Sequence, residues 1–242
     1  MASSFLIAFF TQCIIAVFAL GVLSATDNEG ISNESDVVIY GNTVAALAAA
    51  IQTVRMKKTV ALVFPGSTIG GLTTSGLGWT DSKDGGTIGG IAREFYSKVY
   101  EYYDNDDAWI YETRDDYTDK GIQAQPGPAV DDKVQWTFEP KVAEEIWEKW
   151  IKDENVTVFR NESIARTSSG VTKDSAVIKS FKTLSGSTFS GKMFIDAGYE
   201  GDLMETADIS YRVGREDKQD YNEWAAGIHF NRPGLLSAVD PY

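Results

Sequence analysis

The segment from Gly41 to Ala46 has the residue types of a turn that binds a diphosphate. In the pattern G-x-G-x-x-G a strand runs into a glycine turn, and free N–H groups at the N-terminus of the next helix face the anion. This chain keeps the first glycine, Gly41, has Ala46 as an accepted replacement for the third, and has Thr43 at the second. Thr43 adds bulk where a phosphate approaches, although its hydroxyl could donate to a phosphate oxygen. A strand–helix corner without any ligand is the alternative interpretation.

Phe64 occupies the position at which a dinucleotide-binding fold usually has an acidic residue. That acid follows the second strand and accepts hydrogen bonds from the ribose hydroxyls. A phenyl ring accepts no such hydrogen bond, so the sequence predicts that other groups hold the adenosine end of any bound nucleotide.

The elements that would position this turn form a strand–helix–strand unit. Val37 to Tyr40 is an unbroken apolar run, which is typical of a strand buried on both faces. Val44 to Met56 is rich in alanine and favours a helix, and Thr59 to Phe64 is a second apolar run that ends at Pro65. The spacing predicts two parallel strands joined by a right-handed crossover.

Further elements are predicted along the rest of the chain. A glycine-rich loop follows the second strand, and two amphipathic helices and an antiparallel hairpin come after it. The pattern indicates a doubly wound α/β fold with the hairpin inserted. The predicted ranges are the helices Ile88 to Tyr103 and Lys141 to Asp153, the strand Val156 to Phe159, the hairpin Ala176 to Phe194, and a buried strand from Met193 to Asp196 that returns to the main sheet.

Four stretches of the sequence carry a resemblance to a known family. They are DVVIYGNTVAALAAA, VFPGSTIGGLTTSGLGWTD, GGIAREFY and FIDAGYEGDLMETADISYRVGRE, in this order along the chain. The glycine doublet Gly70-Gly71 and the segment from Tyr199 to Met204 are the specific parts. Over residues 36–216 the chain resembles the N-terminal portion of FAD-dependent oxidoreductases, secreted or bacterial flavoproteins of the glutathione-reductase-like type. The resemblance implies a Rossmann-like FAD-binding sheet and an FAD-dependent oxidoreductase that acts on an unknown small organic substrate.

The resemblance also implies which residues contact the FAD. The dinucleotide turn would hold the pyrophosphate, and the glycine doublet and its threonines would lie along the cofactor. The strand after the second helix would offer its backbone to the adenine, and the returning strand would pass near the diphosphate. The implied cofactor-binding residues are Gly41, Asn42, Thr43, Val44, Ala45, Gly70, Gly71, Thr73, Thr74, Val158, Asp196, Ala197 and Gly198.

The same resemblance suggests how the chain is divided into domains. The FAD/NAD(P)-binding-like domain is expected at residues 36–216, with an acidic insertion at residues 104–128, and a substrate or cap region is expected to begin at residues 217–242. Relatives continue well beyond the position of Tyr242, and there they have the last sheet strand, the helix that faces the flavin ring and most of the cap. If Tyr242 is the last residue of the protein, the cofactor site is expected to be open on one side.

The N-terminus has the features of a secretory signal peptide. Met1 to Thr26 contains no charged side chain, Phe5 to Leu23 is almost wholly apolar, and Leu23-Ser24-Ala25 has the small residues of a cleavage site. We therefore predict a signal peptide at residues 1–25 and a secreted, extracellular protein; an uncleaved membrane anchor is the alternative. Three N-x-S/T sequons fit this route and predict a glycoprotein, at Asn33, Asn155 and Asn161.

The composition excludes several classes of partner and site. The chain carries 22 basic and 35 acidic residues, a formal net charge of −13, which disfavours binding to nucleic acid and, after signal cleavage, to anionic membranes. It has one histidine and one cysteine, so Cys/His zinc and iron–sulfur centres are excluded within this chain and no metal site is predicted.

No catalytic residue is identified from the sequence. Arg93 and Arg215 could stabilise an anionic flavin or bind an acidic substrate, and a surface ion pair is the alternative for each. Glu200 and Asp202 stand near a possible helix start and could cap it. His229 is more simply explained as a structural residue.

Two other functions remain open at this point. One is a non-catalytic, divergent fragment of the same fold, for which Phe64 and Thr43 are the motivation. The other is a secreted carbohydrate-active protein, for which the acidic composition, the aromatic content of 12% and carboxylates such as Asp115 and Asp116 are the motivation. Most glycosidases need two carboxyl groups across a sugar-binding cleft.

Overall fold

The computed structural model describes residues 30–81, 85–119, 133–223 and 226–227. These residues fall into two compact units, one up to Ala207 and the other from Asp208, and each is described by itself. The predicted signal peptide at residues 1–25, His229 and residues 120–128 of the acidic insertion lie outside the described residues. Within the described ranges no helix has the length and apolar character needed to cross a membrane.

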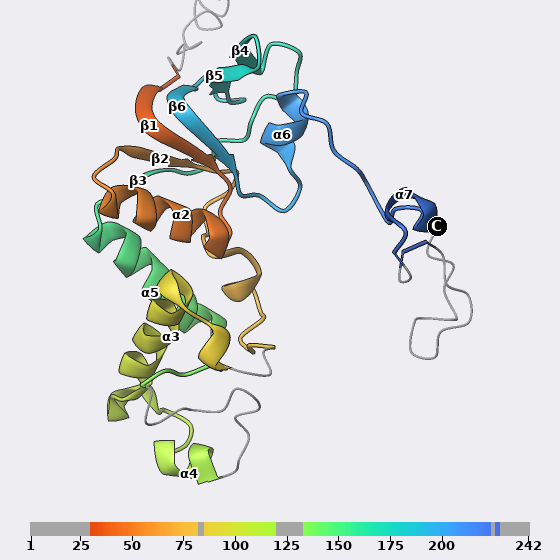
Figure 1. Ribbon diagram of the computed structural model, residues 1–242. Helices are drawn as coiled ribbons and strands as arrows, with labels where there is room; N and C mark the ends of the chain where they lie inside the picture. Colours follow the sequence, from red (N-terminus) through yellow and green to blue (C-terminus); the bar gives the residue numbers. More distant parts are fainter. Residues whose placement is uncertain (1–29, 82–84, 120–132, 224–225, 228–242) are drawn as a thin grey trace, which may run out of the picture. The chain divides into compact units, whose positions relative to one another are not determined.

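The first unit is built on one six-stranded sheet with the strand order β3-β2-β1-β6-β5-β4 (Figure 1). Strand β1 pairs in parallel with both β2 and β6, and β2 pairs in parallel with β3. Strands β4, β5 and β6 form an antiparallel meander. The strands are β1 Ser32–Tyr40, β2 Val60–Val63, β3 Thr157–Phe159, β4 Val171–Asp174, β5 Val177–Lys182 and β6 Thr188–Asp196.

Three long helices, α2, α3 and α5, bury their apolar faces in one hydrophobic core with β1 and β2. Ala46 and Ala50 of α2 are fully buried, and their small side chains let the helix approach the sheet closely. Pro140 begins α5, where its missing N–H costs no helical hydrogen bond. The helices are α2 Val44–Arg55, α3 Gly90–Tyr103, α4 Arg114–Asp119, α5 Pro140–Asp153, α6 Asp202–Thr206 and α7 Lys218–Tyr221, with 3-10 turns η1 Gly71–Thr73, η2 Gly85–Thr87 and η3 Asp106–Ala108.

A second core contains the other face of β1 and the antiparallel strands. Val38 and Tyr40 belong to this second core, whereas Ile39 between them belongs to the helical core. Successive residues of a strand point to opposite faces. The unbroken apolar run of β1 is therefore explained by burial on both faces, as the sequence predicted.

The predicted strand–helix–strand unit, the two amphipathic helices and the hairpin are confirmed within a few residues. One expectation about burial is wrong. The end of β6 was expected to be buried, but the side chain of Met193 is 65% exposed. The reason is the register of the strands. Strand β5 pairs only with Thr188 to Ser190, so in the described structure the rest of β6 has β1 as a neighbour on one side and no paired strand on the other. Strand β4 was not predicted.

Candidate cofactor-binding site

The four parallel strands end at one edge of the sheet. Tyr40 of β1 is in register with Val63 of β2 and with Asp196 of β6, and Val63 is in register with Phe159 of β3. The chain proceeds from β1 to β2 and β3 on one side and returns to β6 on the other side of β1. In α/β proteins, ligands bind outside the carboxyl ends of strands where the strand order reverses. The segments that follow β1 and β6 are therefore the candidate site.

Gly41 brings the end of β1 against the segment that follows β6. Its φ of +133° is a conformation that residues with a side chain rarely adopt, and a Cβ atom here would lie 2.4 Å from the carbonyl carbon of Ala197. The N–H of Gly41 donates to Val63 at 2.9 Å, and the N–H of Ala197 donates to Tyr40 at 2.8 Å. The first glycine of the motif is thus required by close backbone packing.

Thr43 caps α2 and links it to the β6 segment. Its hydroxyl oxygen accepts from the N–H of Ala46 at 3.3 Å, and the hydroxyl donates to the carbonyl oxygen of Ala197 at 2.7 Å. The sequence suggested that this hydroxyl could donate to a phosphate, but the structure uses its proton for Ala197. Ala45 is exposed in the first turn of α2, where the N–H groups of a helix have no acceptor within the helix. Its N–H and the helix dipole favour an anion.

The glycine doublet lies beside this turn. The N–H of Gly70 donates to the carbonyl oxygen of Asn42 at 2.7 Å, and the Asn42 side-chain amide donates to Thr68 at 3.0 Å. Gly70 has a φ of +92°. The hydroxyl of Thr74 donates to the carbonyl oxygens of Ile69 and Gly71, so this threonine holds the loop closed on itself. The structure therefore brings Asn42 and the doublet together, although they are 28 residues apart in sequence.

Tyr199 reaches the same loop from the segment after β6. Its hydroxyl oxygen accepts a hydrogen bond from the N–H of Leu72 at 2.8 Å. A Cβ atom on Gly71 would lie 2.4 Å from that oxygen, so the second glycine of the doublet makes room for the tyrosine. Sequence reasoning noted the segment from Tyr199 to Met204 but gave Tyr199 no role.

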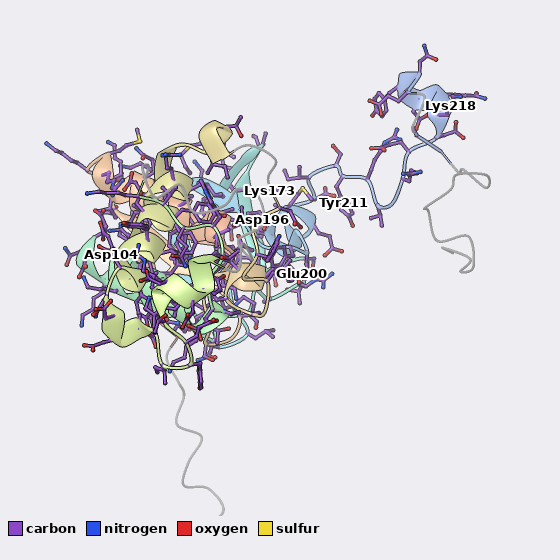
Figure 2. All side chains as sticks on the ribbon, turned by 90° about the horizontal axis from the view of Figure 1, so that it is seen from below. Asp104, Lys173, Asp196, Glu200, Tyr211 and Lys218 are labelled. Atoms are coloured by element: carbon purple, nitrogen blue, oxygen red, sulfur yellow. The ribbon has the colours of Figure 1, made fainter. Side chains whose placement is uncertain are left out.

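Asp196 holds the loop between β6 and α6. Its carboxylate accepts from the N–H groups of Gly198 at 3.2 Å and Met204 at 2.8 Å, and thereby caps α6. Asp196 and Glu200 are labelled in Figure 2. Asp196 is the last residue of β6, and Glu200 comes two residues before α6. The expectation that Glu200 or Asp202 supplies the cap is not met, because Asp202 is the first residue of α6 and pairs with Arg166 at 3.3 Å.

The adenosine side of the site differs from the usual pattern. Phe64 is fully buried in the helical core, and the guanidinium of Arg160 lies 5.5 Å from the centre of its ring. One guanidinium nitrogen of Arg160 also donates to both carboxylate oxygens of Glu148 in α5, each at 2.8 Å. Val158 lies in β3 and pairs with Leu62 of β2, so it is two strands away from β1 and the β1–α2 turn. The strand ends therefore fit a diphosphate, whereas Phe64 leaves the ribose to other groups.

The remaining candidates are placed outside the β1–α2 turn. A guanidinium nitrogen of Arg93 donates to the carbonyl oxygen of Gly85 at 3.4 Å, and one of Arg215, in the second unit, donates to Gly227 at 3.0 Å. Thr73 lies in the η1 turn.

Burial raises the pKa of Tyr40, so its hydroxyl stays protonated at neutral pH. Within the described ranges no cluster of three potential metal ligands occurs.

The parallel strands and the turn at their carboxyl ends form a Rossmann-like α/β fold. Residues 36–236 match the family described as FAD dependent oxidoreductase, and the chain belongs to that family. No curated protein matches the sequence.

Solved structures resemble the chain at low sequence identity. L-amino acid deaminase from Proteus vulgaris is 14% identical, with 75% of this chain and 51% of that chain covered and a TM-score of 0.46. L-proline dehydrogenase from P. horikoshii is 14% identical, with 77% and 59% covered and a TM-score of 0.48. Glycine oxidase from Geobacillus kaustophilus is also 14% identical, with 73% and 59% covered and a TM-score of 0.43. The chain spans between half and three fifths of the length of these three proteins.

Proposed function

We propose that this chain binds FAD and belongs to an oxidoreductase that acts on a small organic substrate. The family match over residues 36–236 carries the proposal. Two features of the structure support it, namely the N-terminus of α2 at the carboxyl end of β1 and the glycine doublet held beside it. Bound FAD would supply hydride and single-electron transfer, and the protein would supply placement and electrostatics.

The diphosphate of FAD is assigned to the first turn of α2. The N–H of Ala45 and the positive end of the helix dipole would bind it, while Thr43 holds the turn against Ala197. The glycine doublet would lie along the cofactor, with its backbone fixed by Asn42 and Tyr199. Because Phe64 accepts no hydrogen bond from a ribose, the adenosine end is held by backbone groups near Val158 in this proposal.

The proposed site can be tested with a charge placed at the helix N-terminus. Ala45 is exposed, so the substitution Ala45→Asp puts a carboxylate at the diphosphate position without disturbing the core. Acids in the first turn also stabilise a helix. We expect the purified wild-type chain to be yellow or to take up added FAD in calorimetry. We expect Ala45→Asp to lose FAD while keeping the melting temperature of the FAD-free wild type.

Ala45→Asn is the matched control, since it has the same size and no charge. We expect it to bind FAD at least about tenfold more tightly than Ala45→Asp. If the wild-type chain takes up no FAD in either experiment, the proposal is wrong and a non-catalytic form of the fold is favoured. If Ala45→Asp binds FAD as well as the wild type does, the diphosphate lies elsewhere.

We further propose that the protein is secreted and glycosylated. Asn155 and Asn161 are exposed and adopt positive φ values in turns, so both have room for a glycan. Asn33 is less accessible, because it lies in β1 and its side-chain oxygen accepts from the hydroxyl of Ser35. Expression in a secreting eukaryotic cell, followed by glycosidase treatment and mass spectrometry, tests the proposal. Retention of the chain inside the cell without glycans would contradict it.

A further inference from the structure

A cavity of about 630 Å³ opens between the C-terminal part of α3, the η3 turn and the start of α5. Its described lining includes Tyr103 of α3, Trp109 after η3, Tyr117 of α4, Phe138 before α5 and Trp79 of the glycine-rich loop. The volume is within the range of sites that hold small molecules. None of the lining residues belongs to the β1–α2 turn, the glycine doublet or the β6–α6 loop. The cavity is therefore a separate feature from the proposed FAD site.

Hydrogen bonds hold the aromatic side chains of the cavity in place. The indole N–H of Trp109 donates to the carbonyl oxygen of Tyr103 at 2.9 Å, and its ring lies 5.4 Å from the ring of Tyr103 and 5.3 Å from that of Tyr117. The hydroxyl of Tyr117 lies 3.1 Å from that of Thr137. The hydroxyl of Tyr103 donates to Glu139 at 2.9 Å. The rings are thus arranged before any ligand arrives, which lowers the entropic cost of binding.

The charges around the cavity favour a cation. Glu112, Glu139 and Glu145 line it, and among the described lining residues Lys141 is the one cation. Lys141 lies 3.7 Å from Glu145, so the charges of these two residues offset each other, and Glu112 and Glu139 account for the excess of negative charge. The faces of tryptophan and tyrosine rings also attract cations. An anionic ligand would meet this excess of carboxylates, whereas a protonated amine would meet both the carboxylates and the ring faces.

We propose that this cavity binds an organic ammonium ion, that is, a protonated or quaternary amine that carries a compact apolar group. The apolar group packs against the aromatic rings, and the ammonium group lies toward the carboxylates that line the cavity. This binding site is independent of the proposed FAD function, because it uses no residue assigned to the cofactor. The negative charge of the lining would also repel ligands that carry a carboxylate.

Benzyltrimethylammonium is a suitable probe, because its charge does not depend on pH. We expect saturable binding to the full chain by calorimetry and by quenching of tryptophan fluorescence. Phenylacetate has the opposite charge and neopentylbenzene has nearly the same shape without charge. We expect both to bind at least about fivefold more weakly than the cation. Equal or tighter binding of phenylacetate, or no saturable binding of the cation, would overturn the proposal.

Two neighbouring glutamates of α5 provide a matched pair of variants. Glu145 lines the cavity and Glu144 does not, so Glu145→Gln and Glu144→Gln make the same change in charge on the same helix. We expect Glu145→Gln to weaken binding of benzyltrimethylammonium at least about threefold, and Glu144→Gln to leave it unchanged. Trp79→Leu removes a half-exposed ring and should also weaken it. Equal weakening by Glu144→Gln would assign the effect to the general charge of the protein, against the proposal.

Discussion

The hydroxyl of Thr43 donates a hydrogen bond to the carbonyl oxygen of Ala197 at 2.7 Å. This contact joins the first helix of the fold to the segment after β6, 154 residues further along the chain. The same hydroxyl oxygen caps α2 through the N–H of Ala46. One side chain therefore fixes the relative position of the two segments that flank the proposed diphosphate site.

Thr43→Val tests this link, because valine has the same shape and lacks the hydroxyl. Thr43 is 5% exposed, so the change leaves the Ala197 carbonyl and the Ala46 N–H without their partner in a buried place. We expect the free energy of unfolding in urea to fall by about 1–3 kcal/mol. Thr43→Ser keeps both hydrogen bonds and should cost less than about 1 kcal/mol. Equal losses in the two variants would show that the threonine methyl group contributes as much as the two hydrogen bonds, which would contradict this expectation.

Gly71→Ala and Tyr199→Phe should show coupled effects. An alanine at position 71 would have a φ of +56° and a Cβ atom 2.4 Å from the Tyr199 hydroxyl oxygen, so we expect Gly71→Ala alone to destabilise the protein by about 1–2 kcal/mol. Tyr199→Phe removes that oxygen and relieves part of the clash. The double variant should therefore be more stable than the sum of the single effects predicts, by about 0.5 kcal/mol or more. Additive effects in urea unfolding would contradict the contact.

Glu162 should make a large contribution to stability although no base pairs with it in the described structure. It is 8% exposed and accepts hydrogen bonds from the hydroxyls of Thr183, Ser185 and Ser187, which form the turn between β5 and β6. Hydrogen bonds to a charged group are worth more than neutral ones. We expect Glu162→Ala to lower the free energy of unfolding by about 2 kcal/mol or more at pH 7. Glu101→Ala, on the exposed face of α3, should change it by less than about 0.5 kcal/mol.

Asp36 should make stability depend on acidity in a defined range. Its hydrogen bonds to Lys192 and Thr59 lower its pKa from 3.8 to about 2. Because the folded-state pKa is the lower one, the stabilisation is complete above the ordinary carboxyl pKa and is lost as the pH falls through the folded value. We expect the wild type to melt at a higher temperature than Asp36→Asn at pH 6. The difference should shrink between pH 4 and pH 2, and a difference that stays constant would show that charge is not the cause.

The local part of the fold was predictable from the sequence because it depends on short-range patterns. The alanine-rich run of α2, the apolar runs of β1 and β2 and the amphipathic spacing of α5 each specify an element without reference to distant residues. The exposed end of β6 was missed because its burial depends on how far β5 pairs with it, which no local pattern encodes.

The site was predictable only as a set of segments. The motif located Gly41 and the resemblance located the glycine doublet and the residues after β6. The contacts that join these segments connect residues 127 and 154 positions apart, and they assign roles that spacing does not reveal. Thr43 donates to the carbonyl oxygen of Ala197, and Tyr199 accepts from the N–H of Leu72 beside the glycine doublet. Both contacts form because the register of β1 with β6 brings these segments together.

The pairing of β6 also has a consequence for behaviour in concentrated solution. Beyond Ser190 this strand is paired in the described structure with β1 alone, and Met193 and Ile195 are exposed there. The unpaired edge of a strand can form hydrogen bonds with an extended segment of another molecule. Lys192, which donates to the carboxylate of Asp36, lies in this part of β6, and its charge opposes such pairing. Neutralising that lysine is thus expected to promote self-association in concentrated solution.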